Sequence, residues 1–491
     1  MPHRLPPSSP DSAFARLPLK PAALANLSKL GYLEPTPIQA AGLPVALAGD
    51  DLIAQAKTGS GKTAVYALAL LDNLDVRDLS VQALVLCPTR ELADQVTQEI
   101  RRLARYLDNV KVLSLVGGSI MRPQMASLLH GAHIVVGTPG RIMDHLQRES
   151  LSLDSLNTLV LDEADRMLDM GFHDDIVYIA KRCPRQRQTL MFSATYPEGI
   201  AQLARQFMRQ PKEVKLTEGH AADKIRQRFY EVAPEERLEA VAHLLNHYRP
   251  TSALAFCNTR QQCKELLDVL RERGFYALAL HGELEQRERD QVLVQFANHS
   301  CTVLVATDVA ARGLDIANLE AVINVDVTPD PEVYIHRIGR TGRADQDGWA
   351  LSLASANQRR RVEAIARETG LAVDWHPLTD LTPGADTPLP PAMATLLILS
   401  GRKDKLRPGD ILGALTGEAG FRADQIGKIQ IAETVSYVAV ARDIARAAER
   451  RLASGKIKGK TVKVHWLDIP TRSGAERPSR ANASLRRRPK P

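Results

Sequence analysis

The chain has 491 residues, of which 44% are hydrophobic and 25% are charged, and its formal net charge is +7. These proportions are ordinary for a globular protein, and the length allows two to four domains, each with its own core. The N-terminal stretch MPHRLPPSSPDS is not apolar, and no stretch approaches the roughly 18 apolar residues that a membrane helix needs. We therefore expect neither secretion nor membrane insertion.

The five cysteines are odd in number and form no CxxC pair. Several of them lie inside apolar runs such as LVLCPT and ALAFCNT. We expect buried, reduced thiols, which favours a cytoplasmic protein without structural zinc.

Positive charge is concentrated at the C-terminal end of the chain. Residues 391–468 carry 14 Lys and Arg against 8 Asp and Glu, and residues 469–491 carry 7 against 1. The remainder of the chain is therefore net negative. This asymmetry predicts a polyanion-binding end attached to a body with another task, although a merely solubilising tail has the same composition.

Short apolar runs alternate with amphipathic helical segments such as residues 90–107, a pattern typical of a parallel sheet covered by helices on both faces. The runs recur after a gap, so two α/β domains are expected, joined near residues 212–222. The expected strands lie in 51–56, 83–89, 111–118, 133–140, 158–165 and 189–195, and then in 252–259, 276–282, 302–308 and 321–327.

The Pro-rich segment LTPGADTPLPPAM, residues 381–393, predicts a linker. After it, the elements follow the order βαββαβ within about 75 residues, which predicts a small antiparallel sheet backed by two helices. The end of the chain, from residue 469, is rich in Pro, Ser and Arg and is predicted to be disordered.

The segment AKTGSGKT, residues 56–63, lies between an expected strand and an expected helix, which is the setting of a Walker A phosphate-binding loop. Glycines let the backbone amides and the helix N-terminus point at phosphates, a lysine reaches the β- and γ-phosphates, and a threonine hydroxyl binds Mg²⁺. The sequence therefore predicts a nucleotide site that contains Thr58, Gly59, Ser60, Gly61, Lys62 and Thr63.

Three carboxylates, Asp162, Glu163 and Asp165, follow the apolar run at residues 159–161. Taken alone, the cluster fits either a solvated acidic loop or a cation site. The phosphate loop favours the cation: Asp162 is predicted to hold Mg²⁺, and Glu163 to orient or deprotonate the attacking water. The second α/β domain has no such loop, so one nucleotide site is expected.

Residues 162–165 spell DEAD, and the chain resembles the DEAD-box RNA helicases over roughly residues 14–375. The resemblance rests on many motifs in order. They are GYLEPTPIQ (31–39), AKTGSGKT, PTRELA (88–93), Gly117–Gly118, TPGR (138–141), SAT (193–195), NTR (258–260), QRERD (286–290), ATDVAARGLD (306–315) and HRIGRTGR (336–343).

The resemblance implies two tandem RecA-like P-loop domains, spanning residues 1–215 and 220–378, then a linker at 379–392, an RRM-like domain at 393–468 and a basic tail at 469–491. It implies that Gln39 reads adenine, that Tyr32 or Phe14 packs on the base unless Phe14 is a core residue, and that Asp315 contacts the ribose. ATP and Mg²⁺ are the implied cofactors.

The same resemblance implies that Arg340 and Arg343 are arginine fingers for the γ-phosphate, so that catalysis requires Lys62, Asp162, Glu163 and both arginines. Asp165, Ser193, Thr195 and His336 are implied to couple the nucleotide site to RNA. The implied RNA contacts of the helicase domains are Thr89, Arg90, Gly118, Thr138, Arg141, Arg260 and Thr307.

The C-terminal domain resembles an RRM that lacks most of the aromatic residues on which RNA bases usually stack. Its one candidate is Tyr437, and its basic candidates are Arg402, Lys403, Lys405, Lys456 and Lys458, which also fit a merely solvated surface. The domain order resembles the bacterial DbpA group. That likeness implies a monomer that binds a hairpin of 23S ribosomal RNA during assembly of the large ribosomal subunit.

The sequence leaves alternatives to this function open. An ATP-gated RNA clamp would use the same site to hold RNA, and a general RNA chaperone would lack ribosomal specificity. A DNA helicase would share the two-domain plan, but the DEAD and Q motifs disfavour it.

Overall fold

The computed structural model describes residues 13–56, 59–196, 198–215, 225–311, 319–342, 347–369, 373–382 and 387–471. The chain forms two compact units, residues 1–219 with 313–315, and residues 220–312 with 316–491.

The first unit is built on a seven-stranded parallel sheet in the order β3-β4-β2-β5-β6-β1-β7. All six strands expected in this part of the sequence are confirmed. Parallel strands need both faces covered, which explains their apolar runs. The strands are β1 Leu52–Gln55, β2 Ala83–Leu86, β3 Val112–Leu115, β4 Ile134–Gly137, β5 Thr158–Leu161, β6 Gln188–Ser193 and β7 Lys212–Lys215.

Helices cover both faces of this sheet, because neighbouring residues of a strand point to opposite sides. Val85 faces the core beneath α3 and α4, whereas Leu84 and Leu86 face the core beneath α6, α8 and α9. The helices are α1 Pro21–Lys29, α2 Pro37–Leu47, α3 Lys62–Asp72, α4 Arg90–Leu103, α5 Met121–Leu129, α6 Pro139–Gln147, α7 Ala164–Asp169, α8 His173–Ala180 and α9 Glu198–Phe207.

The second unit begins with another seven-stranded parallel sheet, in the order β10-β11-β9-β12-β13-β8-β14. Its strands are β8 Ile225–Glu231, β9 Ala253–Cys257, β10 Ala277–Leu280, β11 Val303–Thr307, β12 Ala321–Asn324, β13 Gly348–Ala354 and β14 Trp375–His376. Its helices are α10 Arg237–Tyr248, α11 Arg260–Glu272, α12 Gln286–Ala297, α13 Asp308–Ala311, α14 Pro331–Ile338 and α15 Arg359–Thr369.

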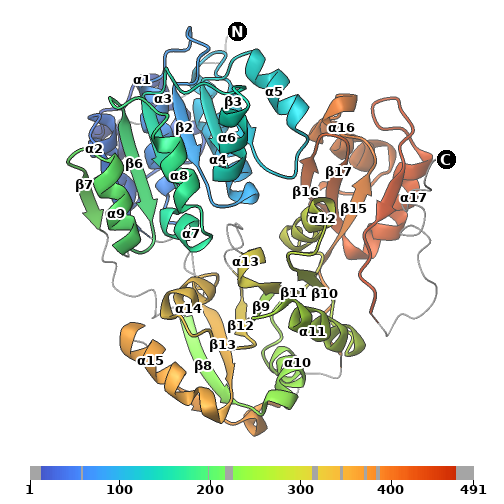
Figure 1. Cartoon of the computed structure of the whole chain (residues 1–491). Helices are drawn as coiled ribbons and strands as arrows, with labels where there is room; N and C mark the ends of the chain where they lie inside the picture. The colour runs from blue at the N-terminus through green and yellow to red at the C-terminus, as the bar shows by residue number, and fades with distance from the viewer. Residues whose placement is uncertain are drawn as a thin grey trace, which may run out of the picture. The chain divides into compact units, whose positions relative to one another are not determined.

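The C-terminal part of the same unit has the predicted βαββαβ order, with a four-stranded antiparallel sheet in the order β16-β17-β15-β18. Two helices close its apolar core, which contains Leu396, Ile398, Val438 and Leu452. The elements are β15 Met393–Ile398, α16 Pro408–Gly413, β16 Ile426–Ile431, β17 Ser436–Ala441, α17 Ala445–Ser454 and β18 Val464–Trp466. The predicted fold class is therefore confirmed in all three parts (Figure 1).

The other face of the small sheet packs on the preceding α/β domain. Leu397 and Tyr437 form an apolar cluster with Val294 of α12. Beside this cluster, the Thr395 hydroxyl hydrogen-bonds to Asn298 Nδ2 at 3.1 Å and to Ser300 Oγ at 2.7 Å. The C-terminal domain is thus seated on its neighbour by a mixed apolar and polar interface.

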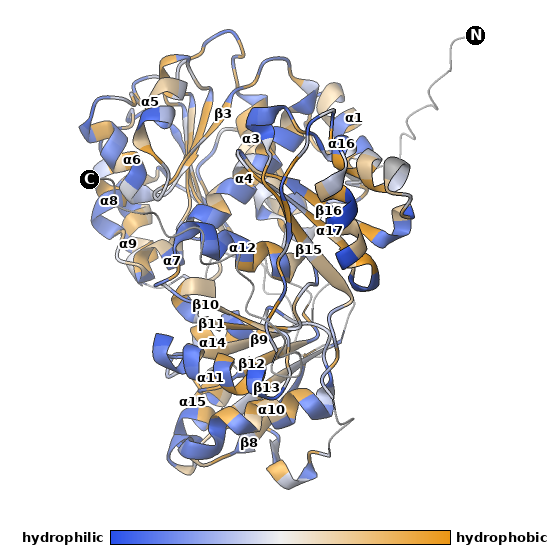
Figure 2. Cartoon of the chain, turned by 90° about the vertical axis from the view of Figure 1, so that its right-hand side faces the viewer, coloured by the Kyte–Doolittle hydropathy of each residue, from blue (hydrophilic) through white to orange (hydrophobic). Residues whose placement is uncertain are grey.

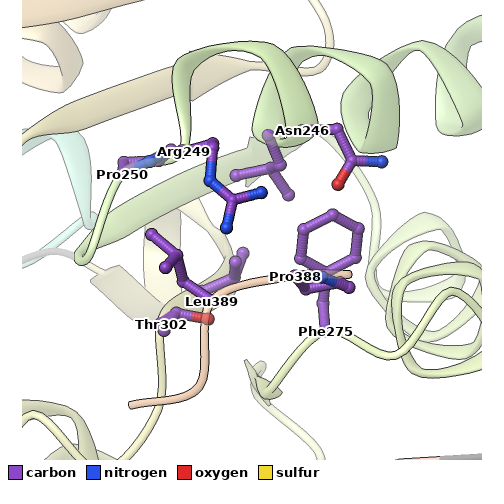
Figure 3. Close-up of a pocket in the computed structure, with 9 residues that line it drawn as sticks. Asn246, Arg249, Pro250, Phe275, Thr302, Pro388 and Leu389 are labelled. Carbon is purple, nitrogen blue, oxygen red and sulfur yellow. The ribbon is translucent and has the colours of Figure 1, made fainter. Parts of the chain in front are cut away.

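The end of the Pro-rich segment also packs on the α/β domain rather than standing clear of it. Pro388 and Leu389 line a shallow pocket together with Leu245 and Phe275 (Figure 3). Arg249 Nη1 donates to the carbonyl oxygen of Thr387 at 3.2 Å.

Apolar residues are concentrated in the strands, and charged residues lie on the outer helix faces (Figure 2). All five cysteines are buried free thiols. Among the described helices, none combines the length and apolar character that crossing a membrane requires.

Candidate functional site

The phosphate loop follows β1 and leads into α3, as predicted. Gly59 and Gly61 have φ values of 82° and 94°, which L-residues rarely adopt, so glycine suits both positions. The Lys62 side chain is buried, and its Nζ donates to the carbonyl oxygen of Ala56 at 2.7 Å. This hydrogen bond holds the lysine side chain across the loop that would bind the phosphates.

A second segment braces this loop. Gln39 Nε2 donates to the carbonyl oxygen of Gly61 at 3.1 Å, and Thr36 Oγ1 donates to that of Ser60 at 2.8 Å. The Gln39 Oε1 atom accepts from the Thr36 backbone amide at 3.0 Å, which closes a capping box at the start of α2. Gln39 therefore lies at the nucleotide loop, and the second hydrogen of its Nε2 is the group that the predicted adenine contact would use.

Asp162 lies at the end of β5, which is two strands from β1 in the sheet. Its carboxylate is 3% exposed and accepts a hydrogen bond from the Tyr66 hydroxyl, 2.7 Å from Oδ2. Burial raises the pKa of Asp162 to about 6, against the opposing effect of the nearby Lys62 charge. A buried carboxylate of this kind calls for a cation.

Glu163 begins α7 in a left-handed conformation, with φ 52°. Its Oε2 atom pairs with Nη1 of Arg166 at 3.0 Å, and both side chains are 5% exposed. A buried ion pair of this kind fixes the geometry of its members, because removing either one leaves an uncompensated charge. Arg166 therefore orients the carboxylate that is predicted to act on water.

Asp165 joins the DEAD segment to the segment after β6. Its Oδ2 atom accepts hydrogen bonds from the backbone amides of Ala194 and Thr195 at 3.0 and 2.9 Å, and from Thr195 Oγ1 at 3.0 Å. The predicted coupling residues Asp165 and Thr195 are thus in direct contact. The buried Ser193 hydroxyl has no hydrogen-bond partner among the described residues.

The donor set fits a magnesium ion. Mg²⁺ prefers oxygen ligands, commonly one or two protein groups combined with phosphates. Asp162 and Thr63 supply a carboxylate and a hydroxyl, and the Asp162 carboxylate accepts a hydrogen bond from the Tyr66 hydroxyl. These two residues would hold the ion, which would neutralise phosphate charge.

The two aromatic candidates for the adenine contact lie in different surroundings. Phe14 is 1% exposed and belongs to the apolar core, where its ring meets that of Tyr32 edge-on with centroids 6.3 Å apart. Phe14 is therefore a core residue and offers no open ring face. Tyr32 is partly buried, and its hydroxyl donates to Glu99.

The predicted RNA contacts of the first unit follow β2, β3 and β4, which are neighbours in the sheet. Thr89 caps α4, accepting from the Leu92 amide at 3.3 Å, and Thr138 precedes α6. The Arg90 guanidinium lies so close to Gly118 that a Cβ there would collide with it. Parallel strands thus bring these residues to one sheet edge.

Arg141 reaches back from α6 across the same edge. Its Nη1 donates to Gln124 Oε1 at 2.8 Å and to the carbonyl oxygen of Ser119 at 3.2 Å. The same Gln124 oxygen lies 3.0 Å from Nε2 of the buried His145. These contacts place Arg141 next to the glycine turn that follows β3.

In the second unit, the predicted residues also lie at strand ends. Arg260 begins α11 just after β9 and pairs with Glu283 at 3.2 Å, and Thr307 ends β11. His336 lies in the last turn of α14, and Arg340 follows that helix as a buried residue. The arginine-finger role of Arg340 stays a prediction.

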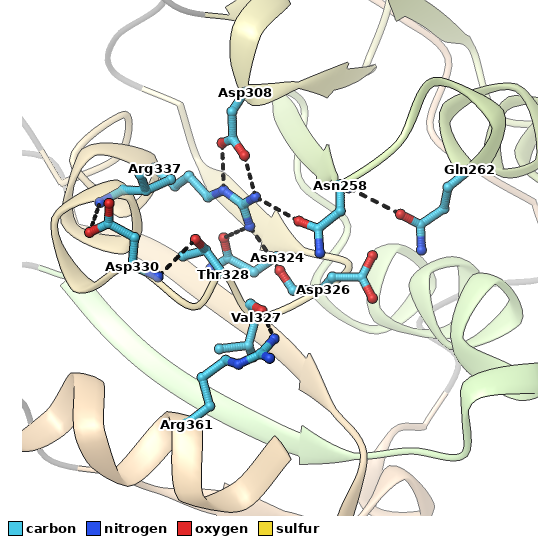
Figure 4. Close-up of polar contacts among 11 residues, drawn as sticks. Asn258, Gln262, Asp308, Asn324, Asp326, Val327, Thr328, Asp330, Arg337 and Arg361 are labelled. Carbon is cyan, nitrogen blue, oxygen red and sulfur yellow. Dashed lines mark hydrogen bonds and ion pairs between the residues drawn. The ribbon is translucent and has the colours of Figure 1, made fainter. Parts of the chain in front are cut away.

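No role was predicted for Arg337, which lies at the centre of these strand-end residues. Its side chain is 1% exposed and binds groups that follow β9, β11 and β12 (Figure 4). The signal was present in the sequence, because each of these apolar strands ends in an uncharged amide or a carboxylate: Asn258, Asp308, Asn324 and Asp326. Such groups at adjacent strand ends call for a buried cation.

The basic C-terminal candidates come from two loops that meet. Lys458 Nζ donates to the carbonyl oxygen of Lys405 at 2.7 Å, and Arg402 Nη2 donates to that of Ile431 at 3.2 Å. Lys403 and Lys456 are exposed in the same two loops. We call residues 402–405 and 456–460 the basic loops.

Tyr437, predicted to bind RNA, is 4% exposed and packs against Val294 and Leu397. Its ring is covered by α12 and cannot stack on a base in this structure. The predicted residues Thr58, Asp315 and Arg343 lie outside the described part of the chain.

Two α/β domains, one carrying a P-loop beside an Asp–Glu pair, define a P-loop nucleoside triphosphatase. The model described as DEAD/DEAH box helicase matches residues 36–203, that described as helicase conserved C-terminal domain matches residues 236–345, and that described as DbpA RNA binding domain matches residues 395–465.

The chain is 51% identical over 460 residues to the ATP-dependent RNA helicase DbpA of Escherichia coli K12, covering 93% of this chain and 100% of that protein. It is 43% identical over 364 residues to the DEAD-box ATP-dependent RNA helicase CshA of Bacillus cereus, covering 74% and 69%. S. cerevisiae Dbp5 bound to RNA and ADP BeF3 is a structural neighbour, with a TM-score of 0.69 and 30% identity, covering 75% of this chain and 96% of that one.

The chain therefore belongs to the DEAD-box ATP-dependent RNA helicases and, within them, to the DbpA type with its RNA-binding C-terminal domain. As members of this family do, it uses ATP and acts on RNA. The resemblance that the motifs indicated is confirmed.

Proposed function

We propose that this helicase remodels 23S ribosomal RNA during assembly of the large ribosomal subunit, as a monomer that uses ATP and Mg²⁺. The observation that carries the RNA target is the matched DbpA RNA binding domain together with the basic loops that it presents. The likeness to DbpA supports the ribosomal assignment.

The chemical step follows from the first unit. Lys62 and the loop amides bind the phosphates, and Glu163, oriented by Arg166, aligns the attacking water. Arg340 and Arg343 of the second unit stabilise the charge that develops on the transferring phosphoryl group. When both are bound, ATP and RNA favour the arrangement in which groups of both α/β domains act on the ATP. Hydrolysis then releases the RNA.

RNA recognition by the C-terminal domain rests on charge and shape rather than on base stacking. Tyr437 is covered, whereas the lysines of the basic loops are exposed. Lysines that neutralise phosphates give salt-dependent affinity and suit a structured RNA. A hairpin with its regular backbone is therefore a better ligand for this surface than a flexible single strand.

The test is a fourfold charge reversal in the basic loops, in which Lys403, Lys405, Lys456 and Lys458 are each replaced by Glu. The concentration of a 23S ribosomal fragment that gives half-maximal ATPase activity should rise at least tenfold. The stronger stimulation by that fragment than by an unrelated RNA of equal length should disappear. Reversal of four exposed basic residues of the first unit, Lys29, Lys181, Arg182 and Arg185, is the matched control for net charge.

A retained preference for the ribosomal fragment in the loop variant would contradict this assignment. Equal stimulation of the unmodified protein by both RNAs would favour the alternative of a general RNA chaperone. Equal duplex displacement with ATP and with a non-hydrolysable analogue would favour the alternative of an RNA clamp that holds rather than turns over.

A further inference from the structure

A buried phenol hydroxyl contacts one of the two side chains that would bind magnesium. Tyr66 lies on α3 one turn after Thr63, so that both side chains share one face of the helix. The Tyr66 hydroxyl donates to Asp162 Oδ2 at 2.7 Å. Thr63 comes from the phosphate-loop helix and Asp162 from the end of β5.

The hydroxyl is held in place by its surroundings. Tyr66 is 0% exposed, and its ring meets that of Phe192 edge-on with centroids 5.1 Å apart. It is flanked in the core by Val65 and Ala67, which are equally buried. The oxygen of such a ring has little freedom, so it can set the direction of the Asp162 carboxylate that contacts it.

The direction of the hydrogen bond is fixed by the chemistry. An ionised carboxylate only accepts, so the phenol proton must point to Asp162. This bond uses Oδ2 and leaves the second carboxylate oxygen of Asp162 for a cation.

We propose that Tyr66 is a positioning residue for magnesium, and that its hydroxyl presents Asp162 to the ion in the orientation that binding requires. This inference rests on the proposed Mg²⁺ site. Groups that orient metal ligands commonly contribute 10- to 100-fold to metal affinity. Tyr66 itself touches neither nucleotide nor metal.

The test is Tyr66→Phe in the full chain, which keeps the ring and removes only the oxygen. Binding of fluorescent ADP is titrated with MgCl₂, and separately measured in EDTA. We expect the MgCl₂ concentration for half-maximal effect to rise about tenfold, while ADP affinity in EDTA stays within twofold. The latter value shows that the loop is folded, because the loop alone binds metal-free nucleotide.

Tyr230→Phe is the matched control. Tyr230 is also buried, and its hydroxyl contacts that of Tyr248 at 2.7 Å, in the second unit. An unchanged MgCl₂ requirement in Tyr66→Phe would overturn the inference. Asp162→Asn distinguishes a failure of the proposed metal site from a failure of the role of Tyr66. If Asp162→Asn also leaves the MgCl₂ requirement unchanged, the proposed metal site is wrong. If Asp162→Asn alone changes the MgCl₂ requirement, only the role of Tyr66 is wrong.

A fall of ADP affinity in EDTA in parallel with the MgCl₂ effect would also count against the inference, because a damaged loop then explains both. Thermal unfolding of the same samples gives the second measurement. The midpoint of Tyr66→Phe should fall somewhat further than that of Tyr230→Phe, since Tyr66 loses a hydrogen bond to a carboxylate and Tyr230 loses one to a neutral hydroxyl. A retained unfolding transition shows that the variant is folded.

Discussion

Arg337 and Asp308 form a two-pronged ion pair, with Nε 2.7 Å from Oδ1 and Nη2 2.6 Å from Oδ2. The remaining guanidinium hydrogens go to Asn258 Oδ1, Asn324 Oδ1 and the carbonyl oxygen of Asp326, at 3.1, 3.3 and 2.8 Å (Figure 4). All five donors of Arg337 are thus used, so this arginine cannot also reach a nucleotide. It fixes α14 to the ends of three strands.

Breaking this pair should destabilise the second α/β domain strongly. Arg337→Met leaves a carboxylate and two amides without their cation, and we expect the free energy of unfolding to fall by about 3–5 kcal/mol. Asp308→Asn should cost less, and the double variant should lose less than the sum of both. Urea unfolding followed by tryptophan fluorescence measures this directly, because Trp349, Trp375 and Trp466, the chain's three tryptophans, all lie in the second unit.

The control for these Arg337 and Asp308 variants is Arg273→Met, which removes an exposed ion pair with Glu239 at 2.9 Å. Exposed pairs contribute less than about 1 kcal/mol. Strictly additive losses in the Arg337 and Asp308 variants would show that the pair is not coupled.

Thr195→Val should separate hydrolysis from unwinding. Valine keeps the shape of threonine and the backbone amide, but loses the hydroxyl that donates to Asp165. A hydrogen bond to a charged group is worth about 1.5–3 kcal/mol, so duplex displacement should slow by about tenfold or more. ATPase activity without RNA should stay within about threefold, because Lys62, Asp162 and Glu163 keep their own contacts.

Thr189→Val on β6, the strand that precedes Thr195, is the control, since its buried hydroxyl has no partner among the described residues. Equal loss of displacement in both variants would mean that the strand, and not the Asp165 contact, is responsible.

Asp162→Asn should stabilise the metal-free protein at neutral pH. Burial raises the pKa of Asp162 from 3.8 to about 6, so the folded state holds this proton more tightly than the unfolded state. At pH 7.5 the ionised carboxylate therefore costs about 2–3 kcal/mol. The cost shrinks as the pH falls through 6 and is gone below the unfolded value near 4.

Unfolding in EDTA, followed by calorimetry at pH 7.5 and pH 5, checks this prediction. The variant should be more stable than the unmodified protein at pH 7.5, and the difference should narrow at pH 5. The exposed Asp174→Asn should show no such pH-dependent gain. A gain that is equal at both pH values would rule out the ionised carboxylate as its cause.

Most central strands of both α/β domains could be predicted because they are buried on both faces and read as apolar runs. The buried strand Gly348–Ala354, which lies inside its sheet, was not predicted. The sequence did not reveal the strand Lys212–Lys215, whose residues are mostly charged and which lies at the sheet edge, or Ile225–Glu231, which alternates with Arg and Gln. An edge strand exposes side chains that a central strand cannot, so its pattern resembles a loop.

The site was predictable where one motif supplies one contact, as for Lys62 in the phosphate loop. It was not predictable where the partner comes from a distant segment. Tyr437 looks like a base-stacking residue until α12 is found to cover it, and Tyr66 looks like one more core residue of an apolar helix until Asp162 is found beside its hydroxyl. Such contacts depend on tertiary packing, which no local pattern records.

The central claim is that one ATP is hydrolysed by groups from both α/β domains, and Arg340→Ala tests it most directly. RNA-stimulated ATPase turnover is compared with that of Arg360→Ala, an exposed arginine of α15. We predict that Arg340→Ala loses about 10³-fold or more in turnover at saturating ATP and RNA, while Arg360→Ala stays close to the unmodified protein. Turnover of Arg340→Ala within threefold of the unmodified protein would contradict the claim.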